Sequence, residues 1–456
     1  MPSADSGLLV LADDLSGAAE AAATLGSPVR VLLTGSNSSL SSHGFHDLAA
    51  ESPMDIAVDL DCRYLCPADA VSRTNAALDV LRARERFTYI KIDSLLRGNI
   101  TAHLSAAIDH SSGPVIFAPT LPQQNRTVVG GVPFMDGVRL DETRAWSVED
   151  GSAPASLSDL CPEQPAHLEL GQLRASEPQE LTAWFRSARL ITADAESMED
   201  LEQIVALAKS TGAVIVGSAA LARAFADTRS DHLAPTAGSG TSQPDSDISQ
   251  RDSRSSSAPS DASDLPILFA LGTAADRIDD QLAHLRSHAT VDVVDIPASE
   301  LAAWADNAGV LAATADRVRA GLGRGHLVVR LTDSGESVDP RPLPGLLADL
   351  IAHSLTNFGP VHLAATGGET ARALLDRLGI HALDAIREIH PGAVLSQVGA
   401  TSASSGERTE LSRVVTRPGG QGDESSLAHI YDALTQTSTQ SASSPRALSR
   451  TTKENE

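Results

Sequence analysis

Residues 88–99 read TYIKIDSLLRGN and join a short strand pattern to a dense group of polar side chains. The first half alternates polar and apolar residues, as a half-buried strand does. The second half brings two cations, a carboxylate, a hydroxyl and an amide into one turn, namely Lys91, Arg97, Asp93, Ser94 and Asn99. Ligands bind beyond the carboxyl ends of strands in open α/β sheets, so the stretch predicts a site for a small hydroxylated anion. The alternative is a solvated turn whose charges lie together by chance.

Strand and helix patterns alternate on both sides of this stretch. An apolar run at 8–12 ends at Asp13 and Asp14, as a buried parallel strand that leads to a site does, and Ser16 then caps an Ala-rich helix. A helical pattern covers 68–84. Further strand patterns occupy 29–33, 56–60, 115–118, 189–193, 213–216, 266–271, 291–296, 326–331, 361–365 and 411–416. The alternation predicts an α/β fold of mainly parallel sheets covered by helices.

The length of the chain and its local composition predict two domains. A chain of 456 residues exceeds the size to which one hydrophobic core normally grows. Residues 228–264 are rich in Ser, Asp, Pro and Gly and almost free of large apolar side chains, so we expect a disordered linker or insertion there. We therefore place the domains at 1–227 and 265–435, each with its own sheet, and a disordered tail at 436–456.

Composition narrows the class of partner. A net charge of −24 and an aromatic content of 3% argue against nucleic-acid binding. No run approaches the roughly 20 apolar residues of a membrane span, and the first residues lack the features of a signal peptide. The cysteines, Cys62, Cys66 and Cys161, form neither a disulfide framework nor a zinc motif. We expect a soluble cytoplasmic protein with no membrane partner.

Glycine turns after strands indicate anion sites in the second half. Residues 361–370, VHLAATGGET, place a Gly-Gly turn between a strand and a helix, where bare backbone N–H groups can meet a phosphate. The turn RPGGQG at 417–422 and the pair at 272–273 also follow strands. Glycine also serves tight strand-to-helix corners, but we favour the phosphate interpretation. None matches a Walker A loop or the GxGxxG fingerprint. The candidate nucleotide-binding residues are Thr273, Gly367, Gly368, Glu369, Thr370, Gly419, Gly420 and Gly422.

Acidic and basic residues at strand ends of the first half have two interpretations each. Asp13 and Asp14 could accept hydrogen bonds from sugar hydroxyls or help to hold Mg²⁺, or they could complement the dipole of the following helix. Arg126 could bind a carboxylate through two N–H groups or be a solvated loop residue.

Taken together, these stretches resemble the four-carbon acid sugar kinases, which include D-threonate, D-erythronate and 3-oxo-tetronate kinases. The family's ADDLTGA, KxDSTLRGN and PxxGRTTxxG motifs resemble residues 12–18, 91–99 and 122–130. Its TGGETA and KxGGFG turns resemble residues 366–371 and 417–422. Three segments depart from the family pattern: GSCS reads GTAA at 272–275, the Lys before the last turn is Arg417, and EPGVPLG reads HPGAVLS at 390–396.

The resemblance implies an N-terminal domain that binds a sugar acid, a C-terminal domain that binds ATP, and an active site in the cleft between them. The implied reaction transfers the γ-phosphoryl group of ATP, with Mg²⁺, to the terminal hydroxyl of threonate, erythronate or a 2- or 3-oxo-tetronate. We assign substrate binding to Lys91, Ser94, Arg97, Gly98, Asn99, Asn125 and Arg126. Asp93 would orient or deprotonate the attacking hydroxyl, with Asp13 and Asp14 as the other candidates.

In this assignment the cations Lys91, Arg97 and Arg126 hold the carboxylate of the acid, while Asp13, Asp14 and Asn99 hold its hydroxyls. A homodimer is compatible with such a protein. The rival interpretation is a non-catalytic sensor that binds a sugar acid and a nucleotide and signals through domain closure. The intact acidic residues of the first half favour the enzyme.

Overall fold

The structure is a computed structural model of the chain. It describes residues 7–26, 29–34, 55–81, 86–147, 149, 151–230, 265–272, 277–306, 308–333, 335–336, 338–399, 411–419 and 422–436. Most of the predicted linker, from residue 231 to 264, lies outside the described residues, as does the predicted tail from residue 437 onward. The site candidates Thr273 and Gly420 also lie outside them.

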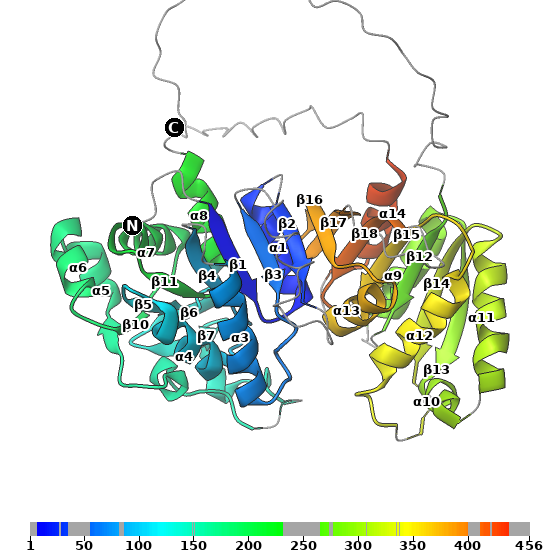
Figure 1. Cartoon of the computed structure of the whole chain (residues 1–456), viewed down its shortest axis with the longest axis horizontal. Coiled ribbons are helices and arrows are strands. Elements are labelled where there is room, and N and C mark those ends of the chain that lie inside the picture. Colours follow the sequence, from blue (N-terminus) through cyan, green and yellow to red (C-terminus); the bar gives the residue numbers. More distant parts are fainter. Residues whose placement is uncertain are drawn as a thin grey trace, which may run out of the picture.

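The N-terminal half is a parallel sheet covered by helices on both faces (Figure 1). The strands lie in the order β2 (Val29–Leu33), β3 (Ile56–Asp59), β1 (Leu8–Ala12), β4 (Phe87–Lys91), β11 (Val214–Gly217), β5 (Val115–Ala118), β10 (Leu190–Ala193) and β9 (Ala166–Leu168). One face packs against α3 (Pro67–Leu81) and α4 (Ile100–His110). The other packs against α1 (Leu15–Leu25), α5 (Leu170–Ala175), α6 (Pro178–Phe185), α7 (Met198–Thr211) and α8 (Ala220–Ser230).

The C-terminal half repeats this layering around a mixed sheet. Parallel strands lie in the order β13 (Val291–Pro297), β14 (His326–Thr332), β12 (Ile267–Leu271), β15 (Val361–Thr366) and β18 (Leu411–Arg417), and antiparallel β17 (Ala393–Val398) and β16 (Ala382–His390) follow. Helices α9 (Ile278–His288) and α14 (Ser426–Thr435) cover one face. Helices α10 (Ala298–Ala302), α11 (Ala308–Leu322), α12 (Leu343–Leu355) and α13 (Gly368–Arg377) cover the other.

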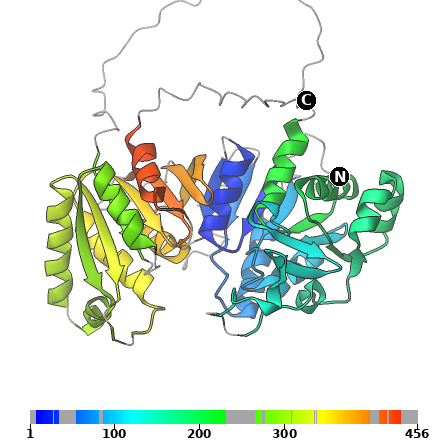
Figure 2. The same ribbon diagram turned by 180° about the vertical axis from the view of Figure 1, so that it is seen from behind.

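The two halves share one continuous sheet. Strand β16 pairs antiparallel with β2 (Figure 2), so the strands named above form one sheet, which has 15 strands in the described part of the chain. On one face of this sheet a single hydrophobic cluster extends from α1 across to α12 and α13. The predicted α/β class with mainly parallel, helix-covered sheets is confirmed. The edge-to-edge pairing was not predicted, because the patterns that identify a strand do not identify its neighbour.

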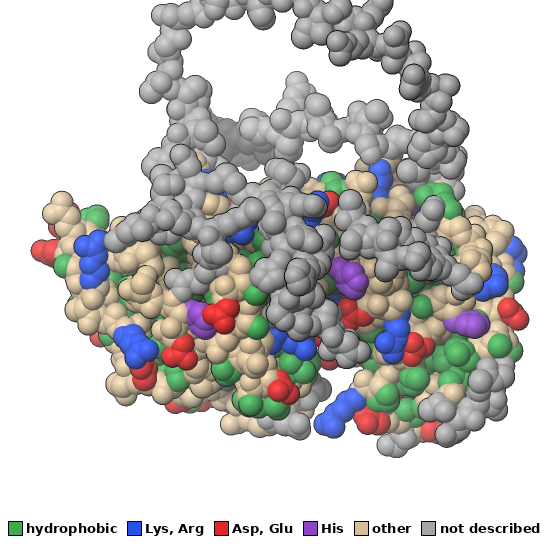
Figure 3. Space-filling model, viewed as in Figure 1, with side chains coloured by type: hydrophobic (Ala, Val, Ile, Leu, Met, Phe, Trp, Pro, Cys, Tyr) green, Lys and Arg blue, Asp and Glu red, His purple; other side chains and the backbone are tan. Residues whose placement is uncertain are grey.

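A small antiparallel sheet projects from the N-terminal half. It consists of β6 (Arg126–Val129), β7 (Val132–Met135) and β8 (Val138–Arg139), so Arg126 begins a strand rather than lying in a loop. On the face shown in Figure 3, acidic and basic side chains are interspersed over both halves. Within the described ranges, no helix is both long enough and apolar enough to cross a membrane.

Candidate active site

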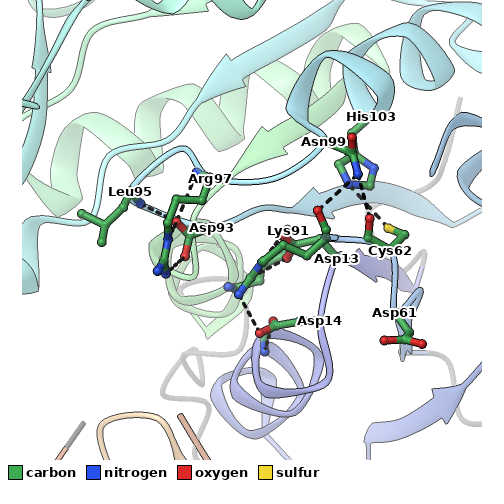
Figure 4. A network of polar contacts seen from close by, with 12 residues as sticks. Asp13, Asp14, Asp61, Cys62, Lys91, Asp93, Leu95, Arg97, Asn99 and His103 are labelled. Carbon is green, nitrogen blue, oxygen red and sulfur yellow. Dashed lines mark hydrogen bonds and ion pairs between the residues drawn. The ribbon is translucent and has the colours of Figure 1, made fainter. Parts of the chain in front are cut away.

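The polar residues after β1 and β4 lie together at the carboxyl edge of the N-terminal sheet. These strands are adjacent and parallel, with Ala12 opposite Lys91. Asp13 and Asp14 therefore emerge beside the turn that carries Asp93, and Figure 4 shows these three aspartates around Lys91. Sheet pairing thus brings two segments that are about 80 residues apart in the sequence to one site.

Arg63, which the sequence analysis missed, binds both aspartates after β1. Its Nε and Nη2 donate to the Asp13 carboxylate at 2.7 and 2.9 Å, and its Nη1 lies 2.9 Å from Asp14 Oδ2. The other Asp14 oxygen accepts a 2.8 Å hydrogen bond from the Gly17 N–H and caps helix α1, so the prediction that Ser16 is the cap is wrong. Asp13 is buried, whereas the side chain of Asp14 is 23% exposed, so Asp14 is the more accessible of the two.

Asn99 and Gly98 support the loop that carries Arg63. The Asn99 side-chain amide donates to the backbone carbonyls of Cys62, Arg63 and Leu65 at 2.9, 3.2 and 2.9 Å. Gly98 has a φ of +84°, and a Cβ there would lie 2.9 Å from Arg63 Cγ. Both residues therefore fix the position of the loop from which Arg63 reaches the aspartates.

Asp93 and Arg97, four residues apart, form an ion pair through two hydrogen bonds. Arg97 Nε and Nη2 donate to the two Asp93 oxygens at 2.8 and 2.7 Å, and the Leu95 N–H donates to Oδ2 at 3.0 Å. Burial opposes the ionisation of Asp93, but the Arg97 hydrogen bonds and the nearby Arg63 charge outweigh it and hold the pKa of Asp93 well below its usual range. A carboxylate with so low a pKa is a weak base, so this geometry favours orientation over proton removal.

Arg126 has fewer partners than Arg97. Its Nη1 donates to the Ser94 hydroxyl, and its Nε has no hydrogen-bond partner among the described residues. Burial lowers the pKa of Arg126 below its ordinary value even though Asp93 lies nearby. The adjacent Asn125, at a φ of +51°, donates to Asp136 at 3.1 Å and does not line the pocket described next.

A pocket opens among these side chains and reaches helix α1. Its lining includes the cations Lys91, Arg97 and Arg126, and Pro418 joins them from the C-terminal half. Glu20 of α1 also lines the pocket, and its Oε2 lies 3.9 Å from Lys91 Nζ.

Glu20 was not among the residues that the sequence analysis selected. Burial raises its pKa, and the charge of Lys91 only partly offsets this effect. The sequence does contain a signal for Glu20 as a site residue. Glu20 follows Ser16 by four positions and therefore shares with it one face of the helix that begins after Asp14.

The glycine turns of the C-terminal half lie at one edge because β12, β15 and β18 are adjacent and parallel. The Gly367 N–H donates to the Arg417 carbonyl at 2.8 Å, which ties the turn after β15 to the turn after β18. Gly272 lies so close to Thr370 that a Cβ on Gly272 would clash with the Thr370 hydroxyl. Helix α13 begins at Gly368, and its first N–H groups therefore point to this edge. An anion would be stabilised here.

Arg417 lies fully buried beside the last glycine turn, where Gly419 and Gly422 are described. Its Nη1 donates to Gln281 Oε1 at 2.9 Å and to Ser426 Oγ at 2.6 Å, while Nε and Nη2 have no partner among the described residues. Burial lowers its pKa to about 10. A buried cation without an acidic partner is costly, and an anion bound at this edge would reduce that cost.

The two halves meet where Gly368 faces helix α1. A Cβ on Gly368 would lie 3.1 Å from Ser16 Oγ and 3.4 Å from Asp14 Oδ2. The Ser16 hydroxyl is buried and has no hydrogen-bond partner among the described residues. The N-termini of α1 and α13 therefore converge at one end of the pocket, where both helix dipoles favour negative charge.

A buried ion pair lies behind this junction. Arg372 of α13 pairs with Asp59 at the end of β3 and donates to the Thr34 carbonyl, and its Nε lies 3.1 Å from Asp376. The side chains of Arg372 and Asp59 are 5% and 0% exposed, so water does not screen their attraction. The pair fixes α13, and with it the Gly368 turn, against the N-terminal half.

Comparison with known proteins assigns a class to each half. Residues 8–225 match a family described as a sugar-binding N-terminal domain, and residues 268–427 match one described as a nucleotide-binding C-terminal domain. The chain is 30% identical over 446 residues to a D-threonate kinase of Cupriavidus necator, covering 95% of this chain and 99% of that protein. It is 27% identical over 442 residues to a D-threonate kinase of Bordetella bronchiseptica, covering 93% and 96%. A solved structure from Salmonella typhimurium LT2 shares the fold, with a TM-score of 0.70 and 18% identity over 93% of this chain and 98% of that one.

Proposed function

The chain belongs to the four-carbon acid sugar kinase family, and on that premise we propose that it uses ATP to phosphorylate the terminal hydroxyl of a four-carbon sugar acid. D-threonate is our first candidate, because two kinases of that name align with nearly the whole chain. The observation that carries the proposal is the contact of Gly368 with Ser16 and Asp14. It brings an anion-binding helix N-terminus of the nucleotide half to the end of a cationic pocket in the sugar half.

The cations of the pocket hold the carboxylate of the acid in this proposal. Arg97 already gives Nε and Nη2 to Asp93, whereas Arg126 keeps an Nε without a partner. The Nε and the adjacent Nη of a guanidinium form the fork that binds a carboxylate through two hydrogen bonds. Arg126 is therefore the main carboxylate ligand, and Lys91 and Arg97 add positive charge.

The acidic residues contribute in different ways. Asp14 borders the pocket and accepts hydrogen bonds from hydroxyl groups of the acid. Asp13 and Asn99 contribute indirectly, because their hydrogen bonds hold Arg63 in place. Asp93 orients the substrate through Arg97, consistent with its low pKa. The Ser94 hydroxyl, which accepts from Arg126, completes this side of the pocket.

The nucleotide phosphates bind at the glycine edge of the C-terminal half. The first backbone N–H groups of α13, from Gly368 onward, point there, and Thr370 adds a hydroxyl, while the Gly367 N–H is already bonded to the Arg417 carbonyl. The turn that contains Gly419 and Gly422 follows the adjacent strand β18. Arg417 supplies a positive charge that no described carboxylate neutralises. Phosphoryl transfer depends mainly on such positioning and charge neutralisation.

Mg²⁺ would accompany ATP and neutralise part of the phosphate charge. In the described part of the chain, no group of three or more His, Cys, Asp or Glu side chains could hold a metal by itself. This fits Mg²⁺, which proteins commonly hold through one or two carboxylates together with substrate phosphates. Glu369 in the first turn of α13 and Asp14 opposite Gly368 would provide them.

A coupled assay of ADP release over a panel of four-carbon acids tests the proposal. We expect Mg²⁺-dependent turnover with D-threonate or another acid of the panel, and little with the corresponding alcohol. Binding of acid and nucleotide without ADP release would support the sensor instead. Failure to bind any acid of the panel would contradict both interpretations.

A further inference from the structure

Three carboxylates line the pocket, namely Asp14, Glu20 and Asp93, and they differ in the partners they already have. Asp14 is paired with Arg63 at 2.9 Å, and Asp93 is paired with Arg97 at 2.7 Å. The Glu20 carboxylate accepts no hydrogen bond among the described residues, and the side chain is 23% exposed. Glu20 is therefore the pocket carboxylate whose oxygens are most available to a ligand.

The position of Glu20 relates it to the nucleotide half. Ser16 and Glu20 lie on one face of α1, about 6 Å apart along its axis, because four residues span slightly more than one turn. Ser16 Oγ lies 3.1 Å from the Cβ position of Gly368. The Lys91 side chain lies against the same first turns of α1, since its Nζ is 2.7 Å from the Cβ position of Gly17 and 3.9 Å from Glu20 Oε2. A hydroxyl group bound to Glu20 would therefore lie next to a phosphoryl group bound at the Gly368 turn.

The charges around Glu20 suit a proton acceptor. Burial raises its pKa, and the ammonium of Lys91 on β4 opposes this effect. Glu388 on β16 and Asp14 at the start of α1 raise the pKa further, and Arg126 on β6 lowers it. The net rise makes Glu20 a stronger base than a solvated glutamate while Lys91 stabilises its ionised form.

We propose that Glu20 binds the hydroxyl group that becomes phosphorylated and accepts its proton, an inference that rests on the proposed kinase activity. The hydroxyl oxygen forms a bond to the γ-phosphorus of ATP. The bond between that phosphorus and the bridging oxygen breaks, and ADP leaves with the electron pair. The hydroxyl proton moves to Glu20, which later returns it to solvent.

Glu20→Gln tests the proton transfer, because it preserves size and removes the base. We expect kcat to fall about 100-fold or more, with ATP affinity within about threefold of the parent. The parent kcat should decrease as pH falls through the raised pKa of Glu20, because the protonated form cannot accept a proton. This acidic limb should disappear in Glu20→Gln, and Glu20→Asp should recover part of kcat. Glu180→Gln, the same change at an exposed position of α6, should match the parent.

Calorimetry of D-threonate binding without nucleotide tests the hydroxyl contact separately. Glu20→Ala should weaken binding about tenfold or more, because a hydrogen bond to a charged group is lost. If the parent binds the acid without forming ADP, the kinase proposal fails, and the affinity loss still decides whether Glu20 contacts the acid. Parent-like kcat and pH profile in Glu20→Gln would overturn the inference, as would a parent that binds no four-carbon acid.

Discussion

Replacing Arg126 by lysine should reduce the preference of the protein for an acid over the corresponding alcohol. Lysine keeps the charge but lacks the planar fork, so one of two hydrogen bonds to the carboxylate is lost. Arg126 can offer that fork because its Nε has no partner among the described residues while Nη1 donates to Ser94. One hydrogen bond to a charged group contributes about 1.5 to 3 kcal/mol, so kcat/KM for the acid should fall roughly 10- to 150-fold. The alcohol has no carboxylate and should lose less than about threefold.

The same substitution at Arg97 is the matched control, because its fork is already occupied by Asp93 at 2.8 and 2.7 Å. Arg97→Lys should lower the melting temperature and reduce turnover of acid and alcohol alike. Steady-state kinetics of the parent and both variants with both substrates give two cycles that isolate the coupling to the carboxylate. An acid-selective loss in Arg97→Lys, together with equal losses in Arg126→Lys, would refute the reasoning and assign the carboxylate to Arg97.

Gly368→Val should weaken ATP binding at least about tenfold by calorimetry, because the valine Cβ would lie 3.1 Å from Ser16 Oγ and its methyl groups would occupy the space where phosphate must meet backbone. Unchanged ATP affinity in a folded variant would remove this turn from the site. Arg372→Met should lower the free energy of unfolding by about 3 to 5 kcal/mol in urea titrations, because it leaves the buried Asp59 carboxyl without its cation. Asp59→Asn in the same chain should recover part of that loss, and a change below about 1 kcal/mol in the single variant would show that the pair does not hold the halves together. Replacing residues 231–262 by a shorter Gly/Ser linker should leave the melting temperature and kcat nearly unchanged, because this composition cannot build a core; a drop of more than a few degrees would show that the segment packs.

The α/β class and the positions of most strands and turns could be predicted from the sequence alone. The apolar run at 8–12, the stretch at 88–99 and the Gly-Gly turn after residue 366 all express backbone preferences of neighbouring residues, which can be read locally. Parallel strands gather their carboxyl ends at one edge of a sheet, which explains why Asp13, Asp14 and Asp93, each of which follows a strand, lie near one another.

How the halves join, and which charges remain available to a ligand, depend on contacts that only the tertiary structure shows. The pairing of β2 with β16 and the ion pair of Arg372 with Asp59 connect residues more than 300 positions apart, and Arg63 reaches Asp13 across 50 positions. No local pattern specifies such partners. The sequence of a motif therefore does not show whether a remote residue neutralises its charged side chain. For this reason Arg97 and Arg126 looked equivalent and Glu20 went unnoticed, because the free energy of a buried charge depends on the groups that folding places around it.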